Sequence, residues 1–429
     1  MKINIFWFRR DLRLEDNTAL RHALDSGLPV LPVFIFDTNI INELASDDPR
    51  VTFIYETLEE INGKLNEKGS SILVLKDEPE NAWKKLIAAF DIDQVFINKD
   101  YEPYSIDRDN RIKRLLNQNN IILNSYKDQV IFEEGEIVKS DGKPYTVFTP
   151  YKTRWLQKLH SEPLKETTTK AKHKGSFHIS DNPFPSMKEL GFKKSSLRVL
   201  PYDLSVIGNY HKYRDLPADD KTSYLSPHLR FGTISIRELV RISDVQNQVF
   251  LSELIWREFF MQILFAFPKV VTESFKSKYD NIRWRNDERD FERWCRGETG
   301  YPIVDAGMRQ LNDTGYMHNR VRMITAGFLC KHLLIDWRWG EAWFAQKLLD
   351  YELSSNNGNW QWAAGTGCDA APYFRVFNPY TQQEKFDPDR VYIRKWVPEY
   401  GKSGYPEPLV EHDFARKRAL ETYKAGLRF

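Results

Sequence analysis

Residues Val30–Phe36 read VLPVFIF, an apolar run too short for a typical helix and too uniform for a strand with one solvated face. A similar run, Ile3–Phe8, precedes it, and Thr18–Ser26 between the two has the apolar spacing of a helix. Strands that are apolar on both faces are typical of parallel sheets covered by helices on both sides. These residues therefore predict an α/β fold.

The same alternation continues outward from this stretch to about residue 130. Further strands are predicted at Ser71–Leu75, Gln94–Asn98 and Ile121–Tyr126, and further helices at Val51–Lys68, Asn81–Phe90 and Tyr104–Asn117. The pattern predicts a doubly wound, parallel, five-stranded, Rossmann-like sheet. No GxGxxG motif follows the first strand, so the usual dinucleotide fingerprint is absent.

The turn after the first strand is instead rich in charge, with Arg9, Arg10, Asp11, Arg13 and Asp16. Two interpretations remain open. The arginines contact a phosphate, or the charges form salt bridges that fix the turn. The balance of acidic and basic side chains favours the salt bridges.

Residues 131–200 change character and predict an interdomain linker. Their basic and aromatic start, through Lys158, is followed by the lysine-rich stretch Lys165–Ser176 and by Pro183, Pro185 and Gly191. From about residue 201 helical spacing dominates, at Ile236–Val245, Phe250–Phe267, Phe291–Arg296, Val304–Thr314, Asn319–Trp337 and Glu341–Leu353. We therefore predict three parts: an α/β domain (1–130), a linker (131–200) and a large all-α domain (201–429).

Composition excludes several classes of protein. The net charge of the 429 residues is only +2, so nucleic acid would need a local basic patch. Three widely spaced cysteines argue against a disulfide framework or a zinc site. No secretory signal and no apolar run of membrane-spanning length is visible, so we expect a soluble, cytoplasmic protein.

Residues Asp350–Phe374, DYELSSNNGNWQWAAGTGCDAAPYF, have few aliphatic side chains but many amides and glycines. Trp360 and Trp362 lie beside three asparagines, a pattern that suits a flat ring held at its edge by amides and flanked by indoles. The alternative is a buried loop with two core tryptophans. Either way we expect a loop. Nine of the twelve tryptophans lie at or after Trp256, which favours a planar ligand or a helical core.

Glu253, Trp256, Arg257 and Phe260 recur at helical spacing and share one face of a predicted helix. A carboxylate and a guanidinium on an apolar face are costly to bury without partners. Two interpretations are equally open: an internal Glu253–Arg257 pair with a core tryptophan, or a binding site.

Two further segments carry polar groups at spacings that suit a binding site. Asn319, Arg322 and Met323 lie within one helical turn, and Asp350 is a natural partner for Arg322. A site for a phosphate or a carboxylate and ordinary surface salt bridges are equally open interpretations of this segment. Thr222–Ser226, TSYLS, precedes a probable helix, where hydroxyls and backbone N–H groups bind phosphate or merely cap the helix.

Six ordered motifs carry a specific resemblance, with FWFRRDLRLEDNTAL (6–20) in support. They are ELIWREF (253–259), TGYPIVDAGMRQL (299–311), MHNRVRM (317–323), LLIDWR (333–338), NNGNWQWAA (356–364) and DAAPYFRVFNP (369–379). Together they resemble the cryptochrome/photolyase family, most closely its class I cyclobutane pyrimidine dimer photolyases. The resemblance covers nearly the whole chain and is weakest at 160–200.

The resemblance implies that the helical domain binds FAD. The implied cofactor-binding residues are Tyr210, Thr222, Ser223, Tyr224, Leu225, Ser226, Phe250, Arg257, Arg322, Asp350, Glu352 and Asn356. Asn356 would face flavin N5 and favour the reduced flavin. Phe250 and Glu352 depart from the family, where Trp and Asp are frequent at these positions. The first departure implies a weaker stacking contact, and the second places a longer carboxylate at the cofactor edge.

The resemblance also implies a site for a thymine dimer flipped out of DNA. Its residues would be Glu253, Trp256, Asn319, Met323 and Trp362. The two indoles would flank the dimer, and a Glu253 whose pKa is raised by burial would donate a proton in a hydrogen bond to its carbonyls. The arginines expected at the DNA phosphates are Arg214, Arg257, Arg320 and Arg375.

Trp360, Trp337 and Trp284 match the family's electron-transfer chain from flavin to surface. The less favoured alternative is that all three are structural core tryptophans. Tyr104 and Ser105 replace the folate-binding Asn–Glu pair of some relatives. A second, antenna chromophore would therefore be a deazaflavin or a flavin rather than folate, or would be absent.

The function implied is light-driven repair of cyclobutane pyrimidine dimers in DNA, by electron transfer from excited reduced FAD, with no metal and no obligate protein partner, in a monomer. A (6-4) photolyase would have histidines at Asn319 and Met323. A cryptochrome-type photoreceptor often replaces the amide at Asn356 and carries a tail. A plain flavin oxidoreductase would need a nicotinamide site, and none is visible.

Overall fold

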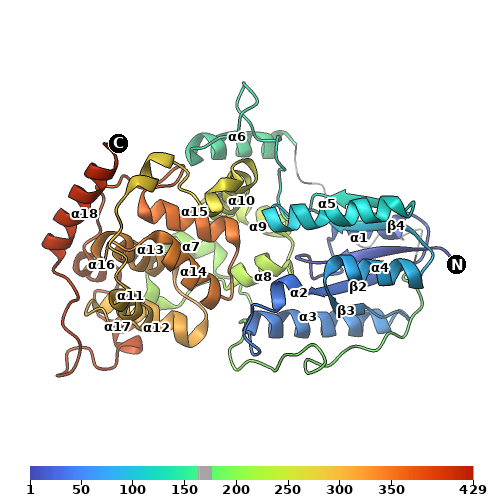
Figure 1. Ribbon diagram of the computed structural model, residues 1–429, viewed down its shortest axis with the longest axis horizontal. Helices are drawn as coiled ribbons and strands as arrows, with labels where there is room; N and C mark the ends of the chain where they lie inside the picture. Colours follow the sequence, from blue (N-terminus) through green and yellow to red (C-terminus); the bar gives the residue numbers. More distant parts are fainter. Residues whose placement is uncertain (163, 165–175, 429) are drawn as a thin grey trace. The chain divides into compact units, whose positions relative to one another are not determined.

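The structure is a computed structural model that describes residues 1–162, 164 and 176–428. The chain forms two compact units, each built from three segments (Figure 1). The first unit comprises residues 1–133, 158–201 and 225–242, and the second comprises 134–157, 202–224 and 243–429.

The first unit contains a five-stranded, all-parallel sheet with the strand order β3-β2-β1-β4-β5. The strands are β1 (Ile3–Phe8), β2 (Val30–Asp37), β3 (Leu73–Asp77), β4 (Ile92–Asn98) and β5 (Ile122–Tyr126). The order reverses beside β1, as in a doubly wound sheet. The predicted fold class is confirmed, and every predicted strand is present within two residues of its expected ends.

Alternating side chains of β1 supply two separate cores, one on each face of the sheet. Phe6 and Phe8 pack with helices α1 (Thr18–Asp25) and α3 (Pro49–Asn66). Ile3, Ile5 and Trp7 pack on the opposite face with α4 (Pro79–Ala89) and α5 (Pro103–Gln118). Because both faces are covered, the strands need apolar residues at every position, which explains why their sequences are uniformly apolar.

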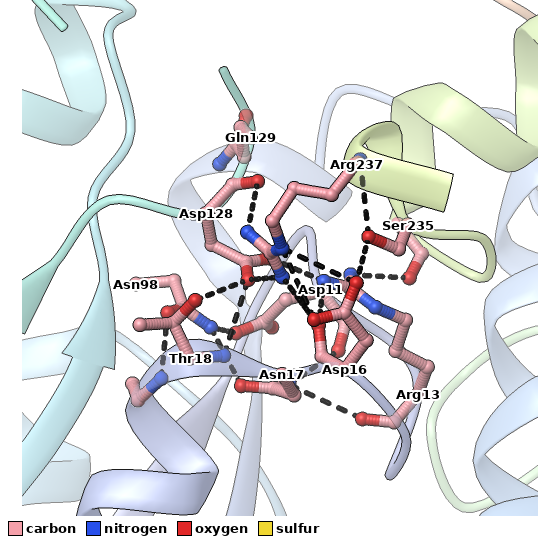
Figure 2. Close-up of polar contacts among 12 residues, drawn as sticks. Asp11, Arg13, Asp16, Asn17, Thr18, Asn98, Asp128, Gln129, Ser235 and Arg237 are labelled. Atoms are coloured by element: carbon pink, nitrogen blue, oxygen red, sulfur yellow. Dashed lines mark hydrogen bonds and ion pairs between the residues drawn. The ribbon is translucent and has the colours of Figure 1, made fainter. Parts of the chain in front are cut away.

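The turn after β1 is held by a buried polar network, shown in Figure 2. Asn98 donates to Asp11 at 2.6 Å, and Arg13 donates to Asp128 at 2.6 Å. Arg237 donates to the second oxygen of Asp128 at 2.8 Å and also contacts Asp16. Burial opposes ionisation of Asp128, but the two arginines outweigh it and lower its pKa to about 2.

The salt-bridge interpretation of this turn is therefore confirmed. Arg9 pairs with Asp109 at 2.5 Å, and Arg10 pairs with Asp100 and Glu102. The guanidinium groups are thus matched by carboxylates of the same unit. Arg237 comes from α9 (Ile236–Gln246), which with α8 (Leu225–Phe231) supplies the C-terminal segment of this unit; α2 (Thr38–Ile41) is a short helix that the sequence did not predict.

The stretch expected to be a surface linker contains ordered, partly buried structure. Helix α6 spans Phe148–Ser161 and buries Tyr151 and Trp155. Leu190 and Phe192 enter the core that covers one face of the sheet. The lysine-rich part of the expected linker, residues 165–175, lies outside the described residues.

The regular elements of the second unit's described residues are helices, apart from one isolated bridge between Val138 and Pro144. Besides the start of α6, it contains η1 (Ile207–Asn209), α7 (Tyr210–Tyr213), η2 (Pro217–Asp219), α10 (Gln248–Ala266), η3 (Pro268–Val271), η4 (Ser277–Asn281), α11 (Glu288–Arg296), α12 (Pro302–Thr314), α13 (Asn319–Gly327), η5 (Phe328–His332), α14 (Trp337–Lys347), α15 (Leu353–Ala364), α16 (Pro379–Phe386), α17 (Val391–Trp396) and α18 (His412–Gly426). The prediction of helices in this part of the chain is confirmed.

The prediction of one helix over Asn319–Trp337 is wrong. Helix α13 ends at Gly327, a π-helical turn (η5) follows, and Leu334 has a left-handed φ of 56°. A β-carbon strains that conformation, so the chain cannot continue as a helix. Asp336 then caps the new helix α14 through the N–H of Arg338, and α14 ends at Lys347 rather than at the predicted Leu353.

The expectation of a loop in Asp350–Phe374 is also wrong, because its central part is helix α15. Three asparagines and a glycine have poor helix propensity, but tertiary hydrogen bonds compensate. Asn357 and Gln361, one turn apart, both donate to the carbonyl oxygen of Val270, at 2.8 and 3.0 Å. Gly365, with φ of 89°, ends the helix in the left-handed conformation.

Candidate active site

The helical unit brings Arg322 of α13 against Asp350, just before α15. The guanidinium donates to Asp350 Oδ2 at 2.8 Å and to the carbonyl oxygen of Met317 at 2.8 Å. The predicted Arg322–Asp350 pair is therefore present. The other carboxylate oxygen of Asp350 and the hydroxyl of Ser354 are buried without a partner among the described residues. Such unpaired polar atoms are costly unless a ligand meets them, so these residues fit a ligand with polar groups.

Asn356, in the first turn of α15, is held by an acidic residue that the sequence did not single out. Its side-chain N–H group donates to Glu341 Oε1 at 2.8 Å and to the Glu341 carbonyl oxygen at 3.1 Å. Burial raises the pKa of Glu341, and the bond from Asn356 opposes this. Glu341 lies one turn after Trp337 on the same helix, the only hint that sequence spacing offered.

Arg257 and Glu352 form a second buried ion pair in this region. They are 3.2 Å apart, with only 11% and 5% of their side chains exposed. Ser355 donates to the other oxygen of Glu352 at 3.0 Å. Phe250, at the start of α10, is buried and packs edge-on against Tyr210, with centroids 5.1 Å apart.

The polar face of α10 makes its ion pairs with other elements rather than within the helix. Glu253 accepts from Arg214 at 2.8 Å, while Arg257 pairs with Glu352. Burial raises the pKa of Glu253, although the Arg214 charge opposes the shift. A raised pKa favours the protonated carboxyl, which can donate a hydrogen bond. Trp256 is partly exposed and stacks on Phe148.

The N-terminal turn of α13 presents Asn319 to solvent and half-buries Met323. Arg320 pairs with Asp215 at 2.7 Å and lies over the ring of Phe386. Three of the four arginines expected at DNA are thus already paired with carboxylates of the chain. Arg375 is exposed, next to the exposed ring of Phe374.

The three tryptophans of the expected electron-transfer chain differ in burial. Trp360 and Trp337 are 2% and 1% exposed, while Trp284 is half-buried and packs edge-on against Tyr423. Helix α14 lies directly against Trp360, because a β-carbon on Gly340 would come within 2.1 Å of the indole. Two buried indoles and one near the surface have the order of exposure that such a chain requires, and a structural role fits the same burial.

The residues expected at the FAD phosphates fall in both units. Tyr224 has a left-handed φ of 51° and donates to Asp220 at 2.5 Å, and Ser223 accepts at its carbonyl from Asp203. Thr222 is half-buried beside them. Leu225 and Ser226 begin helix α8 of the first unit, so the predicted helix after this segment is confirmed.

Tyr104 and Ser105, considered for an antenna chromophore, lie in the first turn of α5 in the first unit. The Tyr104 hydroxyl donates to Asp37 at 2.6 Å, and Ser105 is buried. Burial and this bond raise the pKa of Tyr104 to about 12.

A cavity of about 460 Å³ in the second unit contains none of the predicted site residues. It is lined by Arg296, Glu298, Arg309, Asn312, Asp313, Lys395, Trp396 and Pro398. Among the described residues no cluster of His, Cys, Asp and Glu is arranged to hold a metal ion. Within the same part of the chain, no helix has the length and apolarity needed to cross a bilayer.

Comparison with known proteins identifies the family. Residues 4–170 match the model for DNA photolyase, and residues 250–403 match the model for the FAD binding domain of DNA photolyase. The deoxyribodipyrimidine photo-lyase of Halobacterium salinarum is 36% identical, over 98% of this chain and 99% of its own length. The chain therefore belongs to the DNA photolyase family, as its sequence motifs predicted.

Solved structures support the same family assignment. The archaeal photolyase from Sulfolobus tokodaii, described with two FAD molecules, aligns with a TM-score of 0.87 and 38% identity, covering 99% of this chain and all of its own. The cryptochrome of Synechocystis sp. aligns with a TM-score of 0.85 but only 26% identity, covering 98% of this chain and 99% of its own. Repair enzymes and cryptochromes thus share the fold, and the fold alone does not separate them.

Proposed function

We propose that this chain is a deoxyribodipyrimidine photo-lyase, which uses light and FAD to repair cyclobutane pyrimidine dimers in DNA. The observation that carries the proposal is the 36% identity, over almost the full length of both chains, to a protein of that name. The class I assignment, like the roles of individual residues below, is part of the proposal.

FAD is the cofactor that the matched family model and the unpaired polar atoms beside α15 support. Arg257, Arg322, Asp350, Glu352 and Asn356 would hold its ring system. Tyr210, Phe250 and the segment Thr222–Ser226 would hold the remainder. When bound and reduced, FAD supplies one electron on illumination and recovers it after the dimer has opened, so no net oxidation occurs.

The substrate would be a dimer flipped out of the duplex, because its bond cannot be reached inside the base stack. Trp256 and Trp362 are partly exposed indoles that would stack on its bases. Glu253, whose pKa burial raises, would donate a hydrogen bond to a dimer carbonyl as that oxygen gains negative charge. Asn319 and Met323 would complete the site from α13.

Arg375 would contact the DNA backbone directly, because it is exposed. Arg214 and Arg320 are only partly buried in their ion pairs, at 25% and 18% exposure, and would share their carboxylates with phosphate. Arg257 is more enclosed and is better placed at the cofactor than at DNA.

An illuminated repair assay tests the proposal with two substrates, DNA carrying a cyclobutane dimer and DNA carrying a (6-4) product. Repair of the cyclobutane dimer alone is expected, because neither Asn319 nor Met323 is the histidine that (6-4) repair is associated with. Repair of neither lesion by the FAD-loaded protein would instead favour a cryptochrome-type photoreceptor.

The remaining assignments complete the proposal. The α/β part (1–130) would serve as the antenna-type domain, residues 131–200 as the connection, and residues 201–429 as the catalytic domain. A second flavin in the α/β unit is supported by the two FAD molecules of the Sulfolobus relative. We further propose that the protein acts as a cytoplasmic monomer without an obligate protein partner.

A further inference from the structure

The indole of Trp256 is covered on one face by Phe148, a residue from the stretch that the sequence assigned to a linker. The two rings are nearly parallel, at 7°, with centroids only 3.6 Å apart. Phe260 packs against the same indole at 5.4 Å and a tilt of 28°. Trp256 is therefore fixed in its plane by neighbours before any base arrives.

Phe148 is itself held firmly. Its backbone N–H donates to Asp369 Oδ2 at 3.0 Å, and its side chain is 8% exposed. One turn later along α6, Lys152 donates to Ser252 of α10 at 2.5 Å. The first contact attaches the start of α6 to the segment after α15. The second attaches the next turn of α6 to α10.

A buried carboxylate makes the attachment stronger. Glu258 of α10 is 2% exposed and accepts from the Trp155 indole at 2.6 Å and from the Tyr151 hydroxyl at 3.3 Å. Moving α6 away would leave this carboxylate without those donors, which is costly for a buried charge. Phe148 is thus a fixed support for Trp256 and not a plug that leaves when DNA binds.

We propose that Phe148 is a positioning residue for lesion recognition, which holds the Trp256 indole flat so that the exposed part of the indole stacks on a flipped pyrimidine dimer. The inference rests on the proposed function. It adds a residue outside the family motifs, from helix α6, to the determinants of the substrate site. Phe148 acts through Trp256, and no contact between Phe148 and the DNA is required.

The expected effect follows from the entropy of ordering a side chain. A side chain that must be immobilised on binding costs about 0.5–1.5 kcal/mol, so loss of a support weakens lesion binding by roughly 2- to 12-fold. A flat ring is needed for this support, because parallel stacking restricts the indole to one plane. An aliphatic side chain of similar volume fills the space but does not define the plane.

The test measures the affinity of the FAD-loaded protein, in the dark, for a duplex with one cyclobutane dimer and for the same duplex undamaged. Phe148→Leu is expected to weaken lesion binding within the range given above while affinity for undamaged DNA stays unchanged. Phe148→Tyr keeps the ring and is expected to restore discrimination. FAD content and melting temperature, measured on each variant, show whether it is folded.

Two controls separate positioning from general packing. Phe291→Leu removes another ring stacked on a tryptophan of the same unit, Trp294, and is expected to leave lesion binding unchanged. In a Trp256→Ala background, Phe148→Leu should have no further effect on lesion affinity. Equal lesion affinity of wild type and a folded Phe148→Leu variant would overturn the inference, as would an undiminished effect without Trp256. A wild type that does not distinguish the two duplexes would instead overturn the proposed function.

Discussion

The amide of Asn356 is oriented by the atoms around it. Both of its hydrogen bonds from Nδ2 go to oxygens of Glu341, so the carbonyl oxygen is the end that turns away from α14. Asn356 therefore presents an acceptor to whatever lies beyond α15. An acceptor matches a ring N–H, so under the proposed function Glu341 would orient the Asn356 amide toward the cofactor without touching the cofactor itself.

At Trp360 we expect Trp360→Phe to abolish photoreduction of oxidised FAD while leaving dimer repair intact when the flavin is reduced chemically. The ring that replaces the indole fills most of the space but is much harder to oxidise. Transient absorption and a repair assay with dithionite-reduced protein measure the two activities. Trp343→Phe, on the neighbouring helix and outside the predicted chain, is the matched control. Loss of repair in the pre-reduced Trp360 variant would show a different role.

At the scale of elements, α15 approaches α10 closely at Gly358. A β-carbon there would lie 2.2 Å from the ring of Phe260, which in turn packs against Trp256. Gly358→Ala is therefore expected to destabilise the helical unit by about 1–3 kcal/mol through overpacking, despite the better helix propensity of alanine.

Thermal unfolding measures this effect. Gly63→Ala in helix α3 is the matched control, because an added β-carbon there meets nothing within 4 Å and φ is not left-handed. That variant should gain about 0.5–1 kcal/mol from helix propensity. If both glycine variants were stabilised alike, the close approach at Gly358 would be wrong.

The π-helical turn η5 buries Lys331 against the end of α15. Its ammonium donates to the Ala364 carbonyl oxygen at 2.7 Å and lies 3.7 Å from the Tyr423 ring centroid. Burial lowers the pKa of Lys331 from 10.5 to about 7. Between these values the unfolded chain binds more protons than the folded one, so stability rises with pH in that window.

We therefore expect the free energy of unfolding of Lys331→Met to exceed that of wild type by the largest amount below pH 7. This difference should fall by several kcal/mol as the pH approaches 10, because one pKa unit corresponds to about 1.4 kcal/mol. Denaturant unfolding across this pH range measures the difference. Lys269→Met at an exposed ion pair serves as control and should show no such trend. A difference independent of pH would show that the pKa of Lys331 is the same in the folded and the unfolded chain.

Sequence patterns predicted the strands well and the site only in part. An apolar run such as Val30–Phe36 is decided by its own composition, so its structure can be inferred locally. Helix α15 was missed because hydrogen bonds to Val270, far away in sequence, outweigh its poor propensity. Glu341 and Phe148 were missed for the same reason, since each is defined by a tertiary partner rather than by spacing.

On the scale of the whole molecule, the chain enters each unit more than once. The first unit is completed by residues 225–242, which α9 attaches through Arg237 to Asp16 and Asp128. Removing this guanidinium leaves the carboxylates of Asp16 and Asp128 close together in the network shown in Figure 2. The side chain of Asp128 is only 1% exposed. Arg237→Gln is thus expected to destabilise the α/β unit by about 3–5 kcal/mol.

Denaturant unfolding followed by a probe in the first unit measures this loss. Lys85→Gln breaks an exposed ion pair of the same unit and should cost less than about 1 kcal/mol. Since the pKa of Asp128 is lowered from 3.8 to about 2, the stability that its charge provides is present above pH 3.8 and is lost as pH falls toward 2. Equal stability of the two variants would contradict the network.

The late arrival of Arg237 has a consequence for synthesis on the ribosome. Asp128 and Arg237 are 109 residues apart, so at a translation rate of about 5–20 residues per second Asp128 is synthesised roughly 5–20 s before this second arginine partner. During that interval all five strands have already been made, while Asp16 and Asp128 lack their shared counter-charge. The nascent α/β unit is therefore expected to remain incompletely folded until α9 leaves the exit tunnel. Its folding is completed only when residues 225–242 have been synthesised.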